Sequence, residues 1–305
     1  MLEIFLDTAD IDEIREAVSW GIVDGVTTNP SLIKKAMERR KGKSGSMEDY
    51  IKEMCRSVDG PVSLEVISLT SEKMVQEARI LYKKFNPVNK NVVVKIPINT
   101  NSKISNVGDY EGLKALKALS EEGIPTNATL VMSPEQALLA AKAGADYVSP
   151  FTGRVDDYIR ANLGLKRGED YQKGDYHDSE WLKQSVDLSL IPKRRDLEGK
   201  SVGEIYMNRE VREIMLRSQD NGIYCGVEVI KSVRKIFSNY DIESKIIAAS
   251  MRNARQVREA AEAGADVITI PFKVLQEMLR HHKTSEGVVN FTKDVIPEYK
   301  AIFKS

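Results

Sequence analysis

The residue in this sequence with the clearest chemical potential is a lysine that follows an apolar run. Lys95 comes directly after the valines at 92–94 and before Ile96-Pro97, so its side chain leaves a segment with the composition of a buried strand. Burial favours the uncharged form of an amine, and an uncharged lysine amine can attack a carbonyl carbon at neutral pH. A lysine in this setting could also pair with a buried carboxylate or reach solvent, so Lys95 alone does not specify a reaction.

Carboxylates and other polar groups follow other short apolar runs in the same way. Asp7 and Glu65 could move protons beside such a lysine, because a carboxylate within hydrogen-bond reach acts as a general acid or base. Guanidinium groups bind phosphate oxygens through a fork of donors. The further polar residues that follow these runs are Asn29, Asn127, Thr129, Ser149, Arg154, Ser250 and Arg252.

Several of these residues also have a purely structural interpretation. Asp7 could cap the first helix, and Asn29 could begin the next one. Arg154 could form a surface ion pair with Asp156 or Asp157. Taken singly, these residues leave both interpretations open.

The elements that must position these residues form a repeating pattern. Short β-branched runs alternate with longer amphipathic stretches, which indicates parallel strands joined by helices. The predicted strands are 2–6, 23–27, 62–66, 91–96, 124–127, 146–149, 245–249 and 266–270. They predict an α/β fold, a (β/α)8 TIM barrel that forms a single domain over residues 1–305, with its functional residues at the carboxyl ends of the strands.

A polar, charge-dense stretch at about 162–221 interrupts this alternation after the sixth strand. It is predicted to be a mostly helical insertion, with helices at 178–189 and 201–219 and a turn or loop around 191–195. The insertion could be a solvated excursion, an oligomer contact or a cover over the site. A smaller Gly/Ser/Lys-rich interruption falls at roughly 39–47.

Composition excludes several classes of protein. The 45 basic and 45 acidic residues give a formal net charge of +0, so we expect neither nucleic acid nor a membrane as a partner. The N-terminus has no basic region and no long apolar run of the kind found in signal peptides. Only two cysteines are present, Cys55 and Cys225, which favours a reduced, cytoplasmic location. The three histidines lack metal-ligand spacing, so we expect no metal and no cofactor.

Seven motifs in fixed order resemble those of the transaldolase family, specifically its short-chain branch, which includes fructose 6-phosphate aldolase. The resemblance covers residues 1–161 and 222–305. The motifs are FLDTAD at 5–10, TTNPSL at 27–32, VSLEV at 62–66, VVVKIP at 92–97, TNATLVMS at 126–133, SPFTGR at 149–154 and AASMRNARQV at 248–257.

The resemblance implies a mechanism. Lys95 matches the lysine that forms a Schiff base with the C2 carbonyl of a ketose, and Asp7 matches the carboxylate that exchanges a proton with the C4 hydroxyl. Glu65 and Thr129 match the pair that holds the catalytic water. The substrate-binding positions implied in the same way are Thr28, Asn29, Asn127, Ser149 and Phe151 for the sugar, and Arg154, Ser250 and Arg252 for its phosphate.

Two positions separate transfer from simple cleavage within the family. Fructose 6-phosphate aldolases tend to carry Gln at the position of Glu65 and Tyr at the position of Phe151. The resemblance therefore implies a transaldolase of the pentose phosphate pathway, which moves a dihydroxyacetone unit from fructose 6-phosphate or sedoheptulose 7-phosphate to an aldose phosphate. The alternatives are an aldolase-like enzyme, a variant that acts on a sulfonated or other sugar, and a sugar-phosphate-binding barrel without turnover.

The resemblance also implies a homo-oligomer. Pentamers and decamers occur in this branch, and a C-terminal helix packs on the neighbouring subunit. Residues 284–304 are predicted to form that helix.

Overall fold

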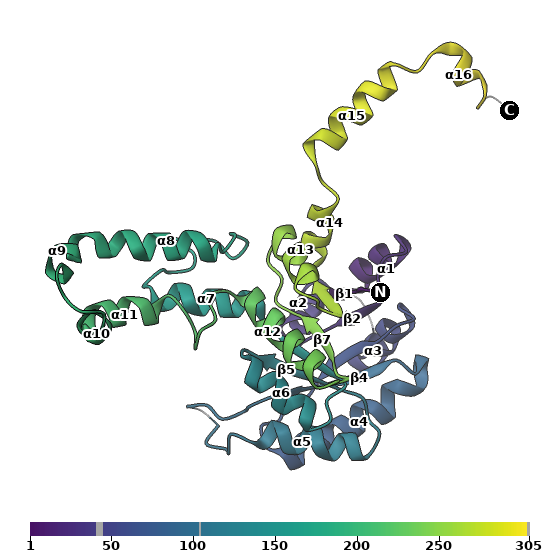
Figure 1. Cartoon of the computed structure of the whole chain (residues 1–305). Coiled ribbons are helices and arrows are strands. Elements are labelled where there is room, and N and C mark those ends of the chain that lie inside the picture. Colours follow the sequence, from purple (N-terminus) through teal and green to yellow (C-terminus); the bar gives the residue numbers. More distant parts are fainter. Residues whose placement is uncertain (41–44, 104, 304–305) are drawn as a thin grey trace.

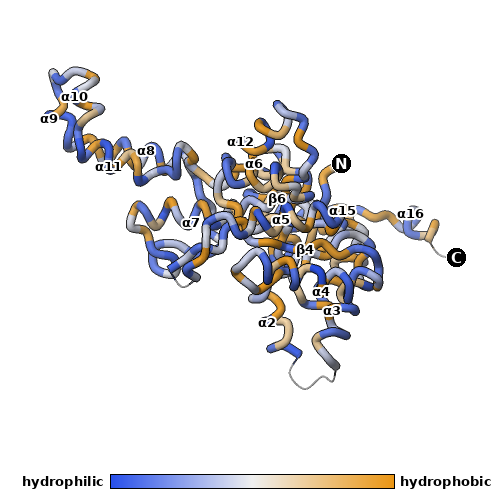
Figure 2. The backbone as a smooth tube through the Cα atoms, turned by 90° about the horizontal axis from the view of Figure 1, so that it is seen from below, coloured by the Kyte–Doolittle hydropathy of each residue, from blue (hydrophilic) through white to orange (hydrophobic). Residues whose placement is uncertain are grey.

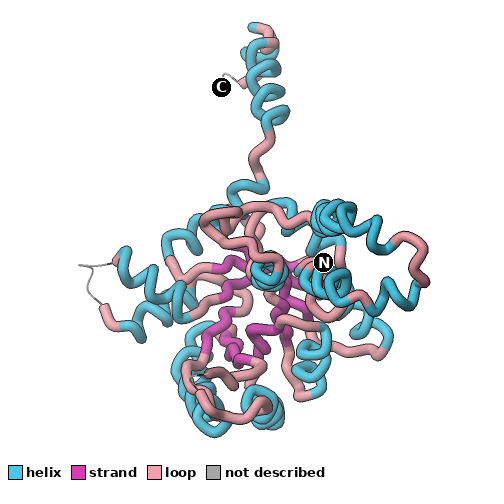
Figure 3. The backbone as a smooth tube through the Cα atoms, turned by 90° about the vertical axis from the view of Figure 1, so that its left-hand side faces the viewer, coloured by secondary structure: helices cyan, strands magenta, loops and turns pink. Residues whose placement is uncertain are grey.

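The computed structural model of the protein describes residues 1–40, 45–103 and 105–303. Eight parallel strands pair in chain order, and the eighth pairs with the first, so the sheet closes into a barrel (Figure 3). The predicted (β/α)8 barrel is confirmed. The strands are β1 (Glu3–Asp7), β2 (Gly25–Thr27), β3 (Val62–Glu65), β4 (Val92–Pro97), β5 (Thr126–Val131), β6 (Tyr147–Pro150), β7 (Lys245–Ala248) and β8 (Val267–Ile270).

The largest error in the predicted strands concerns β5, which extends four residues beyond the predicted end at 127 to Val131. The sequence after Asn127 contains no glycine or proline that would end a strand there. Thr129 therefore lies within the strand and pairs in register with Pro97 of β4.

Helices cover the outside of the barrel and follow the strands along the chain (Figure 1). Asp10, Asn29, Ser46, Ser133 and Asn253 cap five of them with side-chain oxygens, which satisfies backbone donors that have no partner within the helix. The helices around the barrel are α1 (Ile11–Ser19), α2 (Pro30–Arg39), α3 (Met47–Arg56), α4 (Ser71–Asn89), α5 (Glu111–Glu121), α6 (Pro134–Lys142), α7 (Thr152–Asn162), α12 (Gly226–Asn239), α13 (Ala254–Glu262) and α14 (Phe272–Met278). Residues 41–44, part of the interruption predicted at 39–47, lie outside the described residues.

The barrel has two cores because successive strand residues point to opposite faces of the sheet. The larger core lies between the sheet and the helices, and Figure 2 shows apolar segments concentrated in the body of the molecule. The smaller core lies inside the barrel, where Phe5, Ile247 and Val267 are fully buried and Tyr147 packs against them. Beyond this apolar plug, towards the carboxyl ends of the strands, the interior side chains are polar.

The predicted insertion forms a helical arm that extends away from the barrel (Figure 1). It contains α8 (Ser179–Leu190), the 3-10 helix η1 (Ile191–Lys193), α9 (Arg194–Leu197), α10 (Val202–Met207) and α11 (Arg209–Arg217). The turn or loop predicted at 191–195 does turn the chain, but it does so as two short helices and not as an irregular loop. The helix predicted at 201–219 is broken at Asn208, whose side chain caps α11.

The C-terminal segment forms a second projection (Figure 1). The single helix predicted at 284–304 is wrong: α15 (His282–Lys293) ends before Pro297, which begins α16 (Pro297–Ala301). Proline cannot donate the backbone hydrogen bond that a continuous helix would need at this point. No helix among the described residues has both the length and the apolar character needed to cross a membrane.

The packing of the inner core predicts a steric effect at Gly25. A Cβ atom added there would lie 2.7 Å from the ring of Phe5 and 2.8 Å from the carbonyl oxygen of Pro61. We expect Gly25→Ala to lower the free energy of unfolding by about 1–3 kcal/mol, the usual cost of overpacking. Urea denaturation measures this change. The control is Gly287→Ala in α15, where no atom lies within 4 Å of the added Cβ, and an equal loss in both variants would contradict the steric explanation.

Candidate active site

The amine of Lys95 lies inside the barrel, and the side chain is almost completely buried. Its Nζ atom donates a hydrogen bond to the backbone carbonyl of Thr28 at 2.9 Å and lies 3.3 Å from Oε2 of Glu65. Glu65 and Lys95 are register partners on β3 and β4, so strand pairing itself places the carboxylate beside the amine. A buried amine with one carboxylate within reach can act as a nucleophile whose proton has a local acceptor.

Asp7 is the second carboxylate near Lys95, and it is partly buried. It ends β1, and its Oδ1 accepts a hydrogen bond from Thr27 at 2.9 Å. Burial raises the pKa of Asp7 above its ordinary value, and the nearby charge of Lys95 and the bond from Thr27 only partly oppose this. A carboxyl with a raised pKa exchanges its proton more readily near neutral pH. The capping alternative does not hold for Asp7, because Asp10 caps α1.

Three polar side chains connect β3, β5 and β6 across the interior. The amide of Asn127 donates to Ser63 at 3.3 Å, and its Oδ1 accepts from Ser149 at 2.7 Å. Thr129 lies two residues further along β5 and is fully buried, yet its Oγ1 has no hydrogen-bond partner among the described residues. A buried hydroxyl of this kind is a position where an ordered water can bind.

A cavity of about 650 Å³ opens above these groups at the carboxyl ends of the strands. The sequence-predicted residues that line it are Asp7, Asn29, Lys95, Ser149, Phe151, Arg154, Ser250 and Arg252. The other four predicted residues, Thr28, Glu65, Asn127 and Thr129, do not line this cavity. Glu65 and Thr28 instead contact the lysine, and Asn127 contacts Ser149.

Two of the predicted substrate-binding residues also have structural contacts. Asn29 caps α2, since its side chain accepts from the backbone of Leu32 at 3.0 Å, as the structural interpretation proposed. The hydroxyl of Thr28 donates to the backbone carbonyl of Ser63 at 2.8 Å and is fully buried. Asn29 still lines the cavity, whereas the side chain of Thr28 serves to hold the loop after β2.

The two predicted arginines differ in their surroundings. The side chain of Arg252 is only 9% exposed: its Nη2 contacts Asp157 at 2.9 Å and its Nε donates to the carbonyl of Ser250 at 3.1 Å. Its buried Nη1 has no partner among the described residues, so one strong donor stays available for an anion. Arg154 is exposed and lies over the ring of Phe151, with its guanidinium carbon 5.1 Å from the ring centroid.

The ion pairs predicted for Arg154 are not present among the described residues, because other groups occupy both carboxylates. Asp157 binds Arg252 and Arg167. Asp156 is buried and accepts from Gln256 at 2.8 Å and from the backbone of Gly226 at 2.7 Å. Arg154 therefore lines the cavity without an ion pair to either carboxylate, and its charge is available to bind an anion.

Sequence reasoning missed three further cations that line the cavity: Lys35 on α2, and Arg167 and Lys173 on the loop after α7. No motif marks them, and charged residues in a helix or an insertion usually belong to a solvated face. The only available signal was the position of the insertion after a strand whose loop lies on the catalytic side of a barrel.

A (β/α)8 barrel with a lysine amine and two carboxylates below a cationic cavity defines a class of enzyme that acts on anionic carbonyl compounds. Comparison with known proteins is more specific. The family described as transaldolase/fructose-6-phosphate aldolase matches residues 4–180 and 197–304. The chain belongs to this family, as its motifs predict.

Individual proteins similar to this chain carry a name that agrees with this family. A probable transaldolase from Caldicellulosiruptor saccharolyticus is 42% identical over 294 residues, which cover 96% of each chain. A probable transaldolase from Thermoplasma acidophilum is 41% identical over 304 residues, which cover 99% of this chain and 100% of the relative. One from Clostridium tetani is 36% identical, over 99% of this chain and 100% of its own length. The chain is an enzyme of the transaldolase type.

The raised pKa of Asp7 makes a prediction about stability. Keeping this carboxyl ionised in the folded protein costs free energy, and the cost is absent below the ordinary pKa of 3.8 and complete above the raised folded-state value. Asp7→Asn preserves size and removes the charge. Its melting temperature should therefore rise relative to the unmodified protein as the pH increases from about 4 to about 8. Thermal denaturation followed by circular dichroism checks this, and a difference that does not change with pH would contradict it.

Proposed function

We propose that the protein transfers a dihydroxyacetone unit from a ketose phosphate to an aldose phosphate through a Schiff base on Lys95. The observation that carries this proposal is the position of the Lys95 amine, 3.3 Å from Glu65 at the floor of a cavity that also contains Arg154 and Arg252. The donor is fructose 6-phosphate or sedoheptulose 7-phosphate, in line with the motifs of the family to which the chain belongs.

The first half-reaction cleaves the donor. The uncharged amine of Lys95 attacks the C2 carbonyl, and Glu65 donates the proton with which loss of water gives a protonated imine. Glu65 regains this proton when the imine is hydrolysed in the second half-reaction. Asp7 takes the proton of the C4 hydroxyl, the C3–C4 bond breaks, and its electron pair moves into the imine to form an enamine. The aldose phosphate leaves with the new carbonyl at C4. The raised pKa of Asp7 suits this step, because the carboxyl must hold the proton until the next substrate arrives.

The second half-reaction reverses these steps with another aldose phosphate. The enamine carbon attacks the aldehyde, and Asp7 returns its proton to the alkoxide that forms. Water then adds to the imine and releases the new ketose, while Lys95 regains its free amine. Glu65 lies beside the amine, and the unpartnered hydroxyl of Thr129 is available to hold this water.

The remaining site residues bind the sugar along the wall of the cavity. Asn29 and Ser149 face it with groups suited to the donor's hydroxyls, and Asn127 orients Ser149 from behind by accepting a hydrogen bond from its hydroxyl. Arg154 and the free Nη1 of Arg252 bind the phosphate together with Ser250.

Transfer is favoured over cleavage with release of dihydroxyacetone. Glu65 supplies a carboxylate where the aldolases of the family tend to carry Gln, and Phe151 supplies no hydroxyl where they tend to carry Tyr. Without that hydroxyl, protonation of the enamine has one donor fewer, so the enamine survives until an aldehyde arrives.

The proposal places the reaction in the pentose phosphate pathway and in the cytoplasm. Cys55 and Cys225 are both free thiols, which suits a reducing compartment. Burial raises the pKa of each thiol to about 11, so neither is a reactive thiolate at neutral pH.

Trapping tests the nucleophile. We expect borohydride reduction in the presence of fructose 6-phosphate to attach a dihydroxyacetone-derived group to Lys95, because reduction makes the imine permanent. Mass spectrometry of the digested protein locates the modification. Lys95→Arg should show no modification and should lose roughly 1,000-fold or more in activity, since the guanidinium is not nucleophilic. Modification of a different lysine would overturn the assignment.

The acceptor distinguishes the two reactions. With erythrose 4-phosphate added, a transaldolase forms sedoheptulose 7-phosphate. Free dihydroxyacetone in place of the seven-carbon product would show that the enzyme is an aldolase.

We also propose that the protein is a homo-oligomer, a pentamer or decamer, held in part by the C-terminal segment 281–303. This segment presents exposed apolar side chains and has no barrel surface to cover it in the single chain (Figure 1). Such a surface is unfavourable in water, and a second copy of the chain would bury it. Its exposed apolar residues are Val288, Val289, Phe291, Val295, Ile296, Tyr299, Ile302 and Phe303.

Deletion of residues 281–305 tests this assembly. We expect the full chain to sediment as a pentamer or decamer and the truncated chain as a smaller species that remains folded, because the described part of the deleted segment, residues 281–303, lies outside the barrel. Analytical ultracentrifugation measures both. A full chain that sediments as a monomer would refute the proposal.

A further inference from the structure

We propose that Lys173 is a specificity-determining residue that binds the phosphate of the sugar at the mouth of the barrel. The inference rests on the proposed function of this site and deepens it: the insertion, through Lys173, makes the enzyme prefer phosphorylated over neutral substrates. The residue lines the same cavity as Lys95, Arg154 and Arg252, although it comes from a segment outside the barrel.

Lys173 occupies the tip of a closed turn. The backbone N–H of Asp175 donates to the carbonyl of Gln172 at 3.0 Å, and the backbone N–H of Gln172 donates to the Asp175 carboxylate at 2.7 Å. Two hydrogen bonds across four residues fix the direction of the chain at the tip. The lysine is therefore presented from a defined backbone position, unlike a residue on a long open loop.

The turn is anchored to α7 on one side. Arg160 donates to the backbone carbonyl of Tyr176 at 2.7 Å and to that of Asp175 at 3.3 Å. Its guanidinium also lies over the ring of Tyr171, 4.2 Å from the centroid, and both side chains are buried. These contacts hold the chain immediately before and after Lys173.

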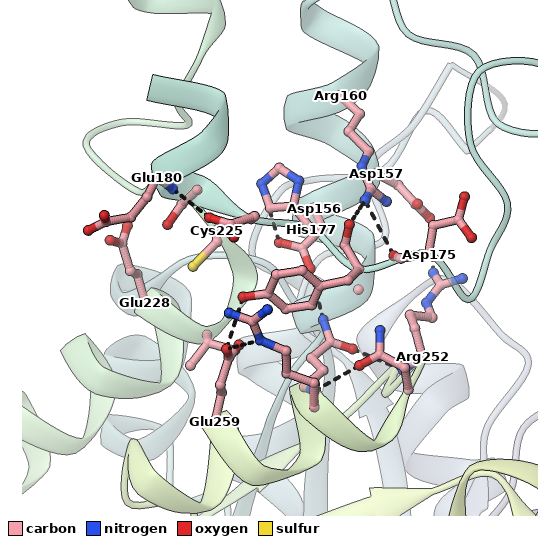
Figure 4. Close-up of a pocket in the computed structure, with 18 of the residues that line it drawn as sticks. Asp156, Asp157, Arg160, Asp175, His177, Glu180, Cys225, Glu228, Arg252 and Glu259 are labelled. Carbon is pink, nitrogen blue, oxygen red and sulfur yellow. Dashed lines mark hydrogen bonds and ion pairs between the residues drawn. The ribbon is translucent and has the colours of Figure 1, made fainter. Parts of the chain in front are cut away.

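A second set of contacts anchors the turn to α13. Tyr176 donates from its hydroxyl to Glu259 at 2.9 Å, and Arg255 lies over the Tyr176 ring at 3.6 Å from the centroid. The side chain of Asn253 donates to the carbonyl of Gly174 at 3.3 Å. Figure 4 shows this region, a separate cavity of about 400 Å³ in which residues of the insertion, α7 and α13 converge.

The charges around Lys173 are those of an anion site. Partial burial lowers the pKa of Lys173, as do the charges of Arg252, Lys35 and Arg167, while the charge of Asp7 acts in the opposite direction. No ion pair to Lys173 is present among the described residues. Asp157 neutralises part of the charge of Arg252 and Arg167. A bound phosphate would offset the remaining repulsion between these cations, and the cluster would therefore be more stable with an anion bound.

Lys166 provides a matched control on the same insertion. It pairs with Glu169 at 3.2 Å, its side chain is 70% exposed, and it does not line the cavity. A solvated lysine of this kind should contribute nothing to the site. Lys173→Gln and Lys166→Gln therefore remove the same charge from two positions on the insertion, of which only Lys173 has access to the cavity.

Binding of glucitol 6-phosphate tests the proposal without any chemistry at Lys95, since this compound has no carbonyl group. We expect Lys173→Gln to weaken binding roughly tenfold in isothermal titration calorimetry at low salt, which is the effect of losing one charge-assisted contact. Lys166→Gln should bind with unchanged affinity. Unchanged affinity in Lys173→Gln, or an equal loss in both variants, would overturn the proposal.

Kinetics separate this inference from the proposed function. In a two-step transfer, kcat/KM for the acceptor reports only on the second half-reaction. Lys173→Gln should lower this value roughly tenfold for erythrose 4-phosphate and leave it unchanged for erythrose. A uniform fall for both acceptors would contradict a role in phosphate binding. Failure to trap Lys95 with fructose 6-phosphate would refute the Schiff base, whereas glucitol 6-phosphate binding would still decide the role of Lys173.

Discussion

The amine of Lys95 is held inside the barrel by two oxygen atoms, and the upper half of the interior is organised around this contact. A buried ammonium group is costly unless partners surround it, and here the carbonyl of Thr28 and the carboxylate of Glu65 supply them. Glu65 comes from β3, which pairs directly with β4, and Thr28 comes from the loop after β2, one strand further round the barrel. The pairing of β3 with β4 thus fixes the chemistry as well as the fold. The apolar plug of Phe5, Ile247 and Val267 closes the barrel below and keeps water from reaching the amine from that side.

The sequence was sufficient to predict the barrel and the residues on its strands. Strand periodicity places Asp7, Glu65 and Lys95 near the carboxyl ends of their strands, and the structure brings them to one level. The motifs could not distinguish residues that contact the substrate from residues that only hold the local structure in place. Asn29 does both, because it caps α2 and also lines the cavity. Thr28 has only the supporting contacts, through its hydroxyl and its carbonyl.

Features that depend on contacts between distant segments could not be predicted. Arg167 and Lys173 reach the cavity because the insertion folds back against α7 and α13, through hydrogen bonds to backbone carbonyls that leave no trace in the sequence pattern. Lys35 reaches it from α2 of the barrel. The break between α15 and α16 had a visible cause in Pro297, but the resemblance to the family implied one helix. At 191–195, where a turn or loop was predicted, short helices form.

The pairing of Asp157 with both Arg252 and Arg167 joins the root of the insertion to the barrel by charge. This root, the loop that follows α7, carries Arg167, whereas Asp157 and Arg252 belong to the barrel. A deletion in this loop would therefore leave the charge of Asp157 partly uncompensated. The outer helices contact the barrel differently, because Leu182 of α8 packs against its larger hydrophobic core. The stretch that the family match omits, residues 181–196, falls among these helices. A change of length or surface beyond Leu182 would therefore leave the charge balance at the cavity intact, whereas a change at the root would alter the ion pairs of Asp157.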